Sequence, residues 1–92
     1  MSYKIELTPQ AEQHLKEWQR SGQTKILNKI ATFFKELVDH PTTGTGQVER
    51  LKGNYSGYWS RRIDKSSRMV YSIEDDRVVV TVVSLKGHYG DK

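Results

Sequence analysis

The first half of the chain shows two different spacings of apolar residues. Residues 3–7 alternate between apolar and polar side chains, which predicts a short strand. After Thr8-Pro9, apolar residues recur at intervals of three and four, first as far as Ser21-Gly22 and then to about Asp39. This period is typical of amphipathic helices, with Thr8 as the first N-cap and Pro41 ending the second helix. We therefore expect one strand followed by two helices.

The second half, after a Gly- and Thr-rich loop at residues 41–46, is made of short runs separated by turn residues. The runs predict strands near residues 48–53, 57–64, 68–74 and 77–86. The expected element order is βααββββ. Because a chain of 92 residues is long enough for one core only, we expect a single α+β domain spanning residues 1–92. Its two N-terminal helices should pack on one face of an antiparallel twisted sheet.

Alternation along the strands predicts which side chains lie under the helices and which lie on the open face. The covered face is expected to hold Trp59, Arg61, Ile63, Met69, Tyr71, Ile73, Val79, Val83 and Leu85. The open face is expected to hold Tyr58, Ser60, Arg62, Arg68, Val70, Ser72, Val80, Val82, Ser84, Lys86 and His88. A bulge in any of these strands would invert the assignment beyond it. With that condition, two arginines and a histidine are expected to emerge together.

Composition and charge narrow the class of protein. The chain has no cysteine, which excludes disulfides and thiolate metal sites and fits a reducing cytoplasm. No apolar run approaches the roughly 20 residues that span a bilayer, so no contact with a membrane is expected. The formal net charge is +4, and residues 49–72 account for this excess with six Lys/Arg against two Asp/Glu.

The basic stretch at residues 49–72 also carries aromatic side chains, namely Tyr55, Tyr58, Trp59 and Tyr71. Cations suit the phosphates of a single-stranded nucleic acid, and rings suit its unstacked bases. The stretch therefore favours binding of nucleic acid. On charge alone, the solvated face of an ordinary small domain is an equal alternative.

Metal ligands do not form a pattern in this sequence. His14, His40 and His88 are far apart, and the acidic run Glu74-Asp75-Asp76 is typical of a solvated hairpin tip. The sequence contains no phosphate-binding glycine loop and no serine nucleophile elbow. We expect neither a metal nor another cofactor.

The residues that remain fit the cleavage of RNA, which carries its own nucleophile in the 2′-OH. Such a reaction needs a base for the 2′-OH, positive charge for the phosphate and an acid for the leaving 5′-oxygen. A carboxylate, guanidinium groups and an imidazole can supply these, since arginine matches phosphate oxygens and keeps its charge. The candidates in this half of the chain are Glu49, Lys52, Arg62, Arg68, His88 and Tyr89.

A resemblance to a known family rests on three parts of this half of the chain. These are Glu49-Arg50-Leu51-Lys52-Gly53-Asn54-Tyr55-Ser56-Gly57-Tyr58-Trp59-Ser60-Arg61-Arg62-Ile63, then Arg68-Met69-Val70-Tyr71, then His88-Tyr89. Together they closely resemble the YoeB (Txe) toxins, a branch of the RelE superfamily of bacterial toxin–antitoxin systems. The chain length, the helix pair and the loop after Pro41 agree with this family as well.

The resemblance implies a RelE-like fold and an mRNA interferase, which is an endoribonuclease that depends on the ribosome. Such a toxin cuts mRNA in the decoding site by metal-free acid–base catalysis and stops translation. Carried over by position, Glu49 is implied to be the general base, His88 the general acid, and Arg68 the group that stabilises the phosphate in the transition state.

The resemblance also implies residues that hold the substrate and proteins that bind the toxin. Lys52 and Arg62 are implied to bind and orient the phosphate backbone, and Tyr89 to help position the substrate or the acid. The implied partners are the ribosome with its mRNA, a cognate YefM-like antitoxin, and a second copy of the chain in a homodimer. An acidic, partly apolar antitoxin tail suits the positive open face.

Two other functions remain open at the level of the sequence. A non-catalytic toxin of the same fold, like the ParE toxins that act on DNA gyrase, needs no acid–base pair. A plain RNA-binding module rests on the basic and aromatic stretch alone, and it predicts salt-sensitive binding without strand scission.

Overall fold

The computed structural model describes residues 2–87, and its N-terminal part follows the predicted pattern. Strand β1 (Lys4–Leu7) leads into helix α1 (Pro9–Ser21) and helix α2 (Thr24–Asp39). Thr8 is the N-cap of α1, and its hydroxyl accepts a hydrogen bond from a backbone N–H of the first turn. Gly22 ends α1 in the left-handed conformation with φ 70°, which glycine adopts without steric cost.

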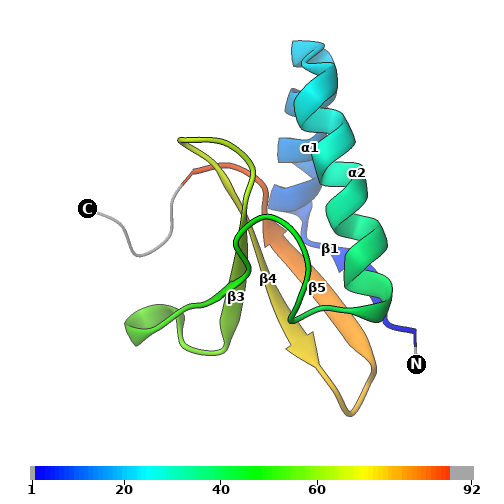
Figure 1. Ribbon diagram of the computed structural model, residues 1–92, viewed down its shortest axis with the longest axis vertical. Helices are drawn as coiled ribbons and strands as arrows, with labels where there is room; N and C mark the ends of the chain where they lie inside the picture. The colour runs from blue at the N-terminus through cyan, green and yellow to red at the C-terminus, as the bar shows by residue number, and fades with distance from the viewer. Residues whose placement is uncertain (1, 88–92) are drawn as a thin grey trace.

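One five-stranded sheet carries both helices on the same face (Figure 1). It is built from β1 with β2 (Glu49–Arg50), β3 (Tyr58–Arg62), β4 (Arg68–Glu74) and β5 (Val79–Ser84), in the order β1-β5-β4-β3-β2. The α+β class and the order βααββββ are confirmed. The sheet is mostly antiparallel, but β1 runs parallel to β5, because two helices separate β1 from the rest of the sheet and allow a crossover.

The strand predicted near residues 48–53 is much shorter than expected. Only Glu49–Arg50 pairs with β3, and Gly53–Tyr55 forms a 3-10 helix, η1. Gly53 has φ 66°, a left-handed conformation that interrupts extended backbone. The chain therefore leaves the sheet edge after Leu51, whose backbone N–H still donates to the Tyr58 carbonyl at 2.9 Å.

A bulge in β5 changes the predicted faces of the last strand. Tyr71 pairs with Val82 but Val70 pairs with Ser84, so Val83 is an additional residue in β5. The placement of Val80 and Val82 on the open face was wrong, since both lie in the core under the helices. Leu85 is buried under the helices as predicted, because the extra residue restores its parity.

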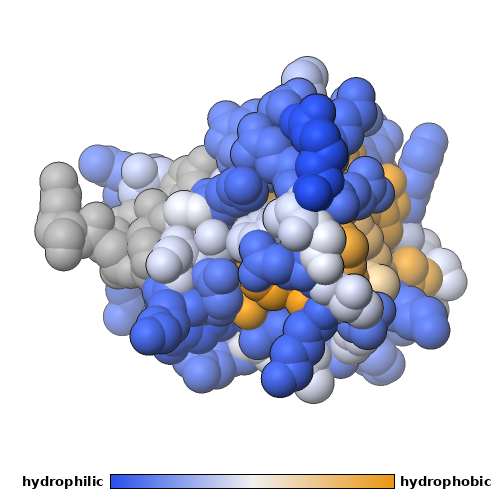
Figure 2. Space-filling view, turned by 90° about the horizontal axis from the view of Figure 1, so that it is seen from above, coloured by the Kyte–Doolittle hydropathy of each residue, from blue (hydrophilic) through white to orange (hydrophobic). Residues whose placement is uncertain are grey.

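The core lies between the helices and the sheet. Its fully or almost fully buried apolar members are Ala11, Trp18, Ile30, Phe33, Leu37, Ile63, Met69, Tyr71, Val80, Val82 and Leu85. Seen from the end at which α1 and α2 meet, the surface is mainly hydrophilic, and hydrophobic colour shows in limited areas between polar groups (Figure 2). Within residues 2–87, neither helix is long and apolar enough to cross a membrane.

Arg61 is the exception in this core, a charged side chain with no exposed surface on the helix side of β3. It donates to the Glu36 carboxylate at 2.6 Å and to backbone carbonyls of His40, Thr43 and Thr45 at 2.9, 2.9 and 3.2 Å. The guanidinium of Arg61 thus connects the loop that follows α2 to the sheet through hydrogen bonds.

The acidic partner of Arg61 is held in its charged form. Desolvation opposes ionisation of Glu36, but hydrogen bonds from the backbone and hydroxyl of Thr45, with the charge of Arg61, outweigh it and lower the pKa of Glu36. Tyr71 completes the cluster by donating to the Pro41 carbonyl at 2.7 Å, and burial raises the pKa of its phenol. The cluster fixes the loop through which the chain passes from α2 to β2.

Candidate active site on the open face of the sheet

Two arginines face each other on the side of the sheet away from the helices. Arg62 at the end of β3 pairs directly with Arg68 at the start of β4, while their neighbours Arg61 and Met69 are buried on the other side. Like charges directly opposite in a sheet are destabilising, so this position favours a bound anion. The predicted meeting of Arg62 and Arg68 on the open face is confirmed.

Glu49 joins this pair from the edge of the sheet. It lies on β2 opposite Ser60 of β3, and its carboxylate lies 3.5 Å from the guanidinium of Arg68. The Glu49 side chain is 61% exposed and that of Arg68 is 18% exposed. A solvent-open carboxylate therefore lies beside a guanidinium that is largely held in place, an arrangement that alternation alone had not predicted.

Lys52 lies in the segment between the short edge strand and η1. It follows Arg50 by two residues and directly precedes η1, and its side chain is exposed. Its ammonium group makes no hydrogen bond or ion pair within the described part of the chain. Arg62 is held more firmly, because its Nε lies 3.4 Å from the carbonyl of Asp64 in the turn before β4. The structure thus places Arg62 and Arg68 in direct register on this side of the sheet.

His88 and Tyr89 lie outside the described residues, so their predicted positions stay predictions. Gly87, which directly precedes His88 in the chain, accepts a hydrogen bond from the backbone N–H of Arg68 at 3.1 Å. The described chain therefore ends beside one of the arginines.

Helix α1 holds the segment that leads to Gly87. Trp18 donates from its indole to the Leu85 carbonyl at 2.9 Å, and the Leu85 N–H donates to Nδ1 of His14 at 3.1 Å. Lys86 pairs with Glu17 at 3.0 Å and lies over the Trp18 ring. The hydrogen bond from Lys86 is the main reason that the pKa of Glu17 is lowered. His14, one of the scattered histidines of the sequence, thus contacts the backbone of Leu85.

Ser60 is a residue of this face that the sequence reasoning did not single out. It is fully buried between Glu49 and Val70, and its hydroxyl has no hydrogen-bond partner within residues 2–87. Buried hydroxyls are normally satisfied, which makes this group unusual. The sequence could have indicated Ser60, because strand alternation places it on the same face as Arg62.

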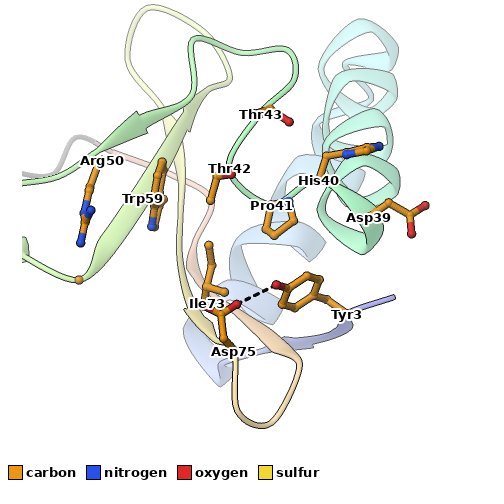
Figure 3. Close-up of a pocket in the computed structure, with 11 residues that line it drawn as sticks. Tyr3, Asp39, His40, Pro41, Thr42, Thr43, Arg50, Trp59, Ile73 and Asp75 are labelled. Atoms are coloured by element: carbon orange, nitrogen blue, oxygen red, sulfur yellow. Dashed lines mark hydrogen bonds between the residues drawn. The ribbon is translucent and has the colours of Figure 1, made fainter. Parts of the chain in front are cut away.

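Two hollows lie on opposite sides of β3. One, of about 450 Å³, lies on the open face beside Tyr58. The other, the Trp59 pocket, has a volume of about 710 Å³ and is lined by Trp59, Arg50 and the loop after α2 (Figure 3). Tyr3 and Asp75 also line it, and the Tyr3 hydroxyl donates to the Asp75 carboxylate at 2.7 Å. Arg50 lies 5.8 Å from the Trp59 ring centre. Among the residues that the structure describes, neither Glu49 nor Arg68 lines the Trp59 pocket.

Among residues 2–87, no three His, Asp or Glu side chains lie close enough together to hold an ion. What the described side chains offer is a carboxylate next to fixed guanidinium groups. That combination can accept a proton and hold a phosphate.

Known proteins resemble this chain in both sequence and structure. Residues 7–89 match the model of the YoeB-like toxin of bacterial type II toxin–antitoxin systems. Toxin YoeB of Synechocystis sp. is 39% identical over 72 residues, which cover 78% of this chain and 81% of that protein. Toxin YoeB of Escherichia coli K12 is 38% identical over 72 residues, which cover 78% of this chain and 82% of that protein.

Solved structures agree with the sequence matches. A YoeB/ParE toxin from Agrobacterium tumefaciens superposes with a TM-score of 0.85 at 31% identity, covering 94% of this chain and 99% of that one. The Staphylococcus aureus YoeB toxin is 33% identical, and the match covers 97% of this chain and 100% of the toxin chain. It has been solved in a heterotetrameric complex with YefM, with a TM-score of 0.80, and as a dimer, with a TM-score of 0.82.

Proposed function

This chain belongs to the YoeB-like toxins of bacterial type II toxin–antitoxin systems, and from that premise we propose that it is an mRNA interferase. It cuts mRNA in the decoding site of the ribosome and so stops translation in the cytoplasm. The observation that supports this most directly is the Glu49–Arg68 ion pair on the open face, with Arg62 opposite Arg68. A base and a phosphate site lie within one side-chain length of each other.

In the proposed reaction Glu49 takes the proton of the 2′-OH, and the 2′-oxygen attacks the adjacent phosphorus. Arg68 and Arg62 bind the phosphate oxygens and stabilise the charge that builds on them in the transition state. The bond from phosphorus to the 5′-oxygen breaks, His88 protonates that oxygen, and a 2′,3′-cyclic phosphate remains. Lys52 binds the phosphate backbone of the strand, and Tyr89 helps to position the substrate or the acid.

We infer that substrate binding prepares Glu49 to act as the base. Arg68 is paired with Glu49 at 3.5 Å, a distance at the long end for a charge-assisted contact. A phosphate arriving between Arg62 and Arg68 offers Arg68 a closer anionic partner. Glu49 is then released toward the 2′-OH.

Proposed partners follow from the relatives and from the charge of this face. The S. aureus toxin was solved with YefM and as a dimer, and we infer a YefM-like antitoxin and a homodimer for this chain. An acidic antitoxin segment would cover the cations of the open face.

The test uses purified protein and ribosomes programmed with a defined mRNA. Glu49→Gln, Arg68→Gln and His88→Gln should each slow cleavage by about 10²–10⁴-fold, the range for loss of an acid–base or charge-stabilising group. Glu74→Gln is a matched control, because Glu74 makes an exposed pair with Arg77 at 2.6 Å far from the site. Cleavage by all three variants at the wild-type rate would refute the proposed roles. Intact mRNA together with inhibited DNA gyrase would favour the ParE-like alternative.

A further inference from the structure

The hollow beside Tyr58 has no part in the proposed reaction, although it lies on the same face. We call it the Tyr58 hollow, and it is lined by Thr8, Pro9, Gln10, Asn54, Tyr55, Tyr58, Val70 and Val83. Its volume of about 450 Å³ falls within the range of small-ligand sites. Val83 reaches this face because of the bulge in β5.

Strand register places the Tyr58 hollow directly beside the proposed site. Val70 lies opposite Ser60, which in turn lies opposite Glu49. Val70 also follows Arg68 by two residues on the same face of β4, which is a step of about 6.6 Å along a strand. A strand of RNA with its phosphate at Arg68 can therefore reach the hollow with a neighbouring base.

The lining of the Tyr58 hollow suits a base and not a phosphate. No Lys, Arg, His, Asp or Glu side chain is among its lining residues. Val83, which is half-buried, offers an apolar surface beside the fully buried Val70, and the Tyr58 ring offers a face for stacking. The cations of this face and its aromatic hollow are thus separate but adjacent. A nucleotide requires this arrangement, because its phosphate needs the cations and its base needs the aromatic ring.

Polar groups at the rim can meet the edge of a base. The Thr8 hydroxyl is already occupied, since it donates to the Val83 carbonyl at 3.1 Å and accepts from the Ala11 N–H. The side-chain amides of Asn54 and Gln10 are exposed and make no hydrogen bond within residues 2–87. Each amide can donate and accept, which is what an unpaired base edge needs.

The Trp59 pocket also has an aromatic wall, but it fits this ligand less well. It lies on the other side of β3 and contains both Arg50 and the acidic residues Asp39 and Asp75 (Figure 3). A strand bound at Arg68 would have to cross the sheet edge to reach it.

We propose that the Tyr58 hollow binds one nucleobase of the mRNA next to the phosphodiester that is cut, with Tyr58 stacking on the base beside Val83. This inference rests on the proposed function. It assigns Tyr58 to substrate selection and gives the toxin a direct contact with a base.

The experiment measures kcat/KM on ribosomes programmed with synthetic mRNAs. In each mRNA one nucleotide of the decoded codon is replaced by an abasic ribonucleotide. For the wild type, the abasic change at one position should lower kcat/KM about tenfold, because stacking on an aromatic ring contributes about that much per base. In Tyr58→Leu the same change should have less than a twofold effect. Tyr58→Phe keeps the ring and should retain the tenfold effect.

Trp59→Leu is the matched control, since Trp59 is the adjacent aromatic residue on the opposite face. It should retain the tenfold ratio, and a ratio within one variant is independent of the fraction folded. The proposal is overturned if Tyr58→Leu keeps the full abasic effect at every position. It is also overturned if that variant loses only affinity for the antitoxin, which would make the hollow a protein-docking site. Uncut mRNA with wild-type protein would instead reject the proposed function itself.

Discussion

Arg61 and Arg62 are neighbours in sequence with opposite environments. Arg61 is fully buried among Glu36 and the carbonyls of the loop after α2, whereas Arg62 lies on the open face. Arg61→Met should lower the free energy of unfolding by about 3–5 kcal/mol, because it removes the charged partner of Glu36 and the donor to three loop carbonyls. Arg62→Met should change it by less than about 1 kcal/mol. Urea unfolding of both variants measures the difference, and equal effects would contradict this account.

Glu36 should make stability sensitive to acid. Its pKa in the folded protein lies below the ordinary value of 4.5, so its charged form is stabilised by folding. That contribution is present above about pH 4.5 and is lost as the pH falls through the folded pKa. Glu36→Gln lacks this group, so the stability gap between wild type and Glu36→Gln should narrow from pH 6 toward about pH 3. Urea unfolding over this range tests it, and a gap that widens in acid would be inconsistent.

The sequence predicted single residues well where only strand alternation was needed. Arg62, Arg68 and Ser60 lie on the face that alternation assigns to them. The partners of Arg61 could not be predicted, because they are carbonyls of a loop that comes close only after α2 has packed. The roles of His88 and Tyr89 rest on the family resemblance and stay predictions.

At the level of elements, the loop after α2 depends on glycines that pack against the core. Gly46 has φ 89°, and a Cβ atom there would lie 2.5 Å from the Phe33 ring. Gly57 has a similar φ of 94° with nothing within 4 Å. Gly46→Ala should therefore destabilise by several kcal/mol, and Gly57→Ala by about 1–2 kcal/mol from backbone strain alone. Thermal unfolding of the two variants separates steric clash from strain.

A control on this interpretation is a substitution of Phe33, the residue that a Cβ atom at position 46 would meet. If Phe33→Leu makes room for that atom, it should reduce the loss of stability caused by Gly46→Ala and leave the loss caused by Gly57→Ala unchanged. Additive penalties in the double variant would mean that Phe33 is not the obstacle.

Helix α1 holds the residues that lead to Gly87, and this should be measurable in local motion. Trp18→Phe keeps a ring in the core but removes the donor to the Leu85 carbonyl, at a cost of about 1–2 kcal/mol. Relative to the wild type, amide exchange at Leu85 should accelerate more than at Val80 in β5. Gln13→Ala, on the exposed side of α1, should leave both rates unchanged. Equal acceleration at Leu85 and Val80 would indicate global destabilisation instead.

The same elements show where sequence patterns fail. The helices were predicted with their ends because caps and breakers are local signals. The bulge at Val83 was not, since nothing in a run of valines marks which residue is extra. The edge strand after the loop was predicted too long, because its extended pattern continues past the point where Gly53 turns the chain.

For the whole molecule, the feature that no local pattern could supply is the parallel pairing of β1 with β5. Lys4 pairs with Val79, and these residues lie at opposite ends of the sequence. This pairing places Thr8 and the start of α1 beside Val83, and so forms one wall of the Tyr58 hollow. The site residues come from a short stretch, but their surroundings come from both ends of the chain.

The charge of the whole molecule leads to a last prediction, on the binding of single-stranded RNA by the Glu49→Gln variant. If Lys52, Arg62 and Arg68 are the phosphate contacts, the logarithm of the binding constant should fall with log salt at a slope of about −2, from about −0.7 per contact. Arg62→Gln in that background should reduce the slope by about 0.7. Lys25→Gln, an exposed cation at the start of α2, should leave it unchanged. Equal losses from both substitutions would mean that net charge, and not the open face, attracts RNA.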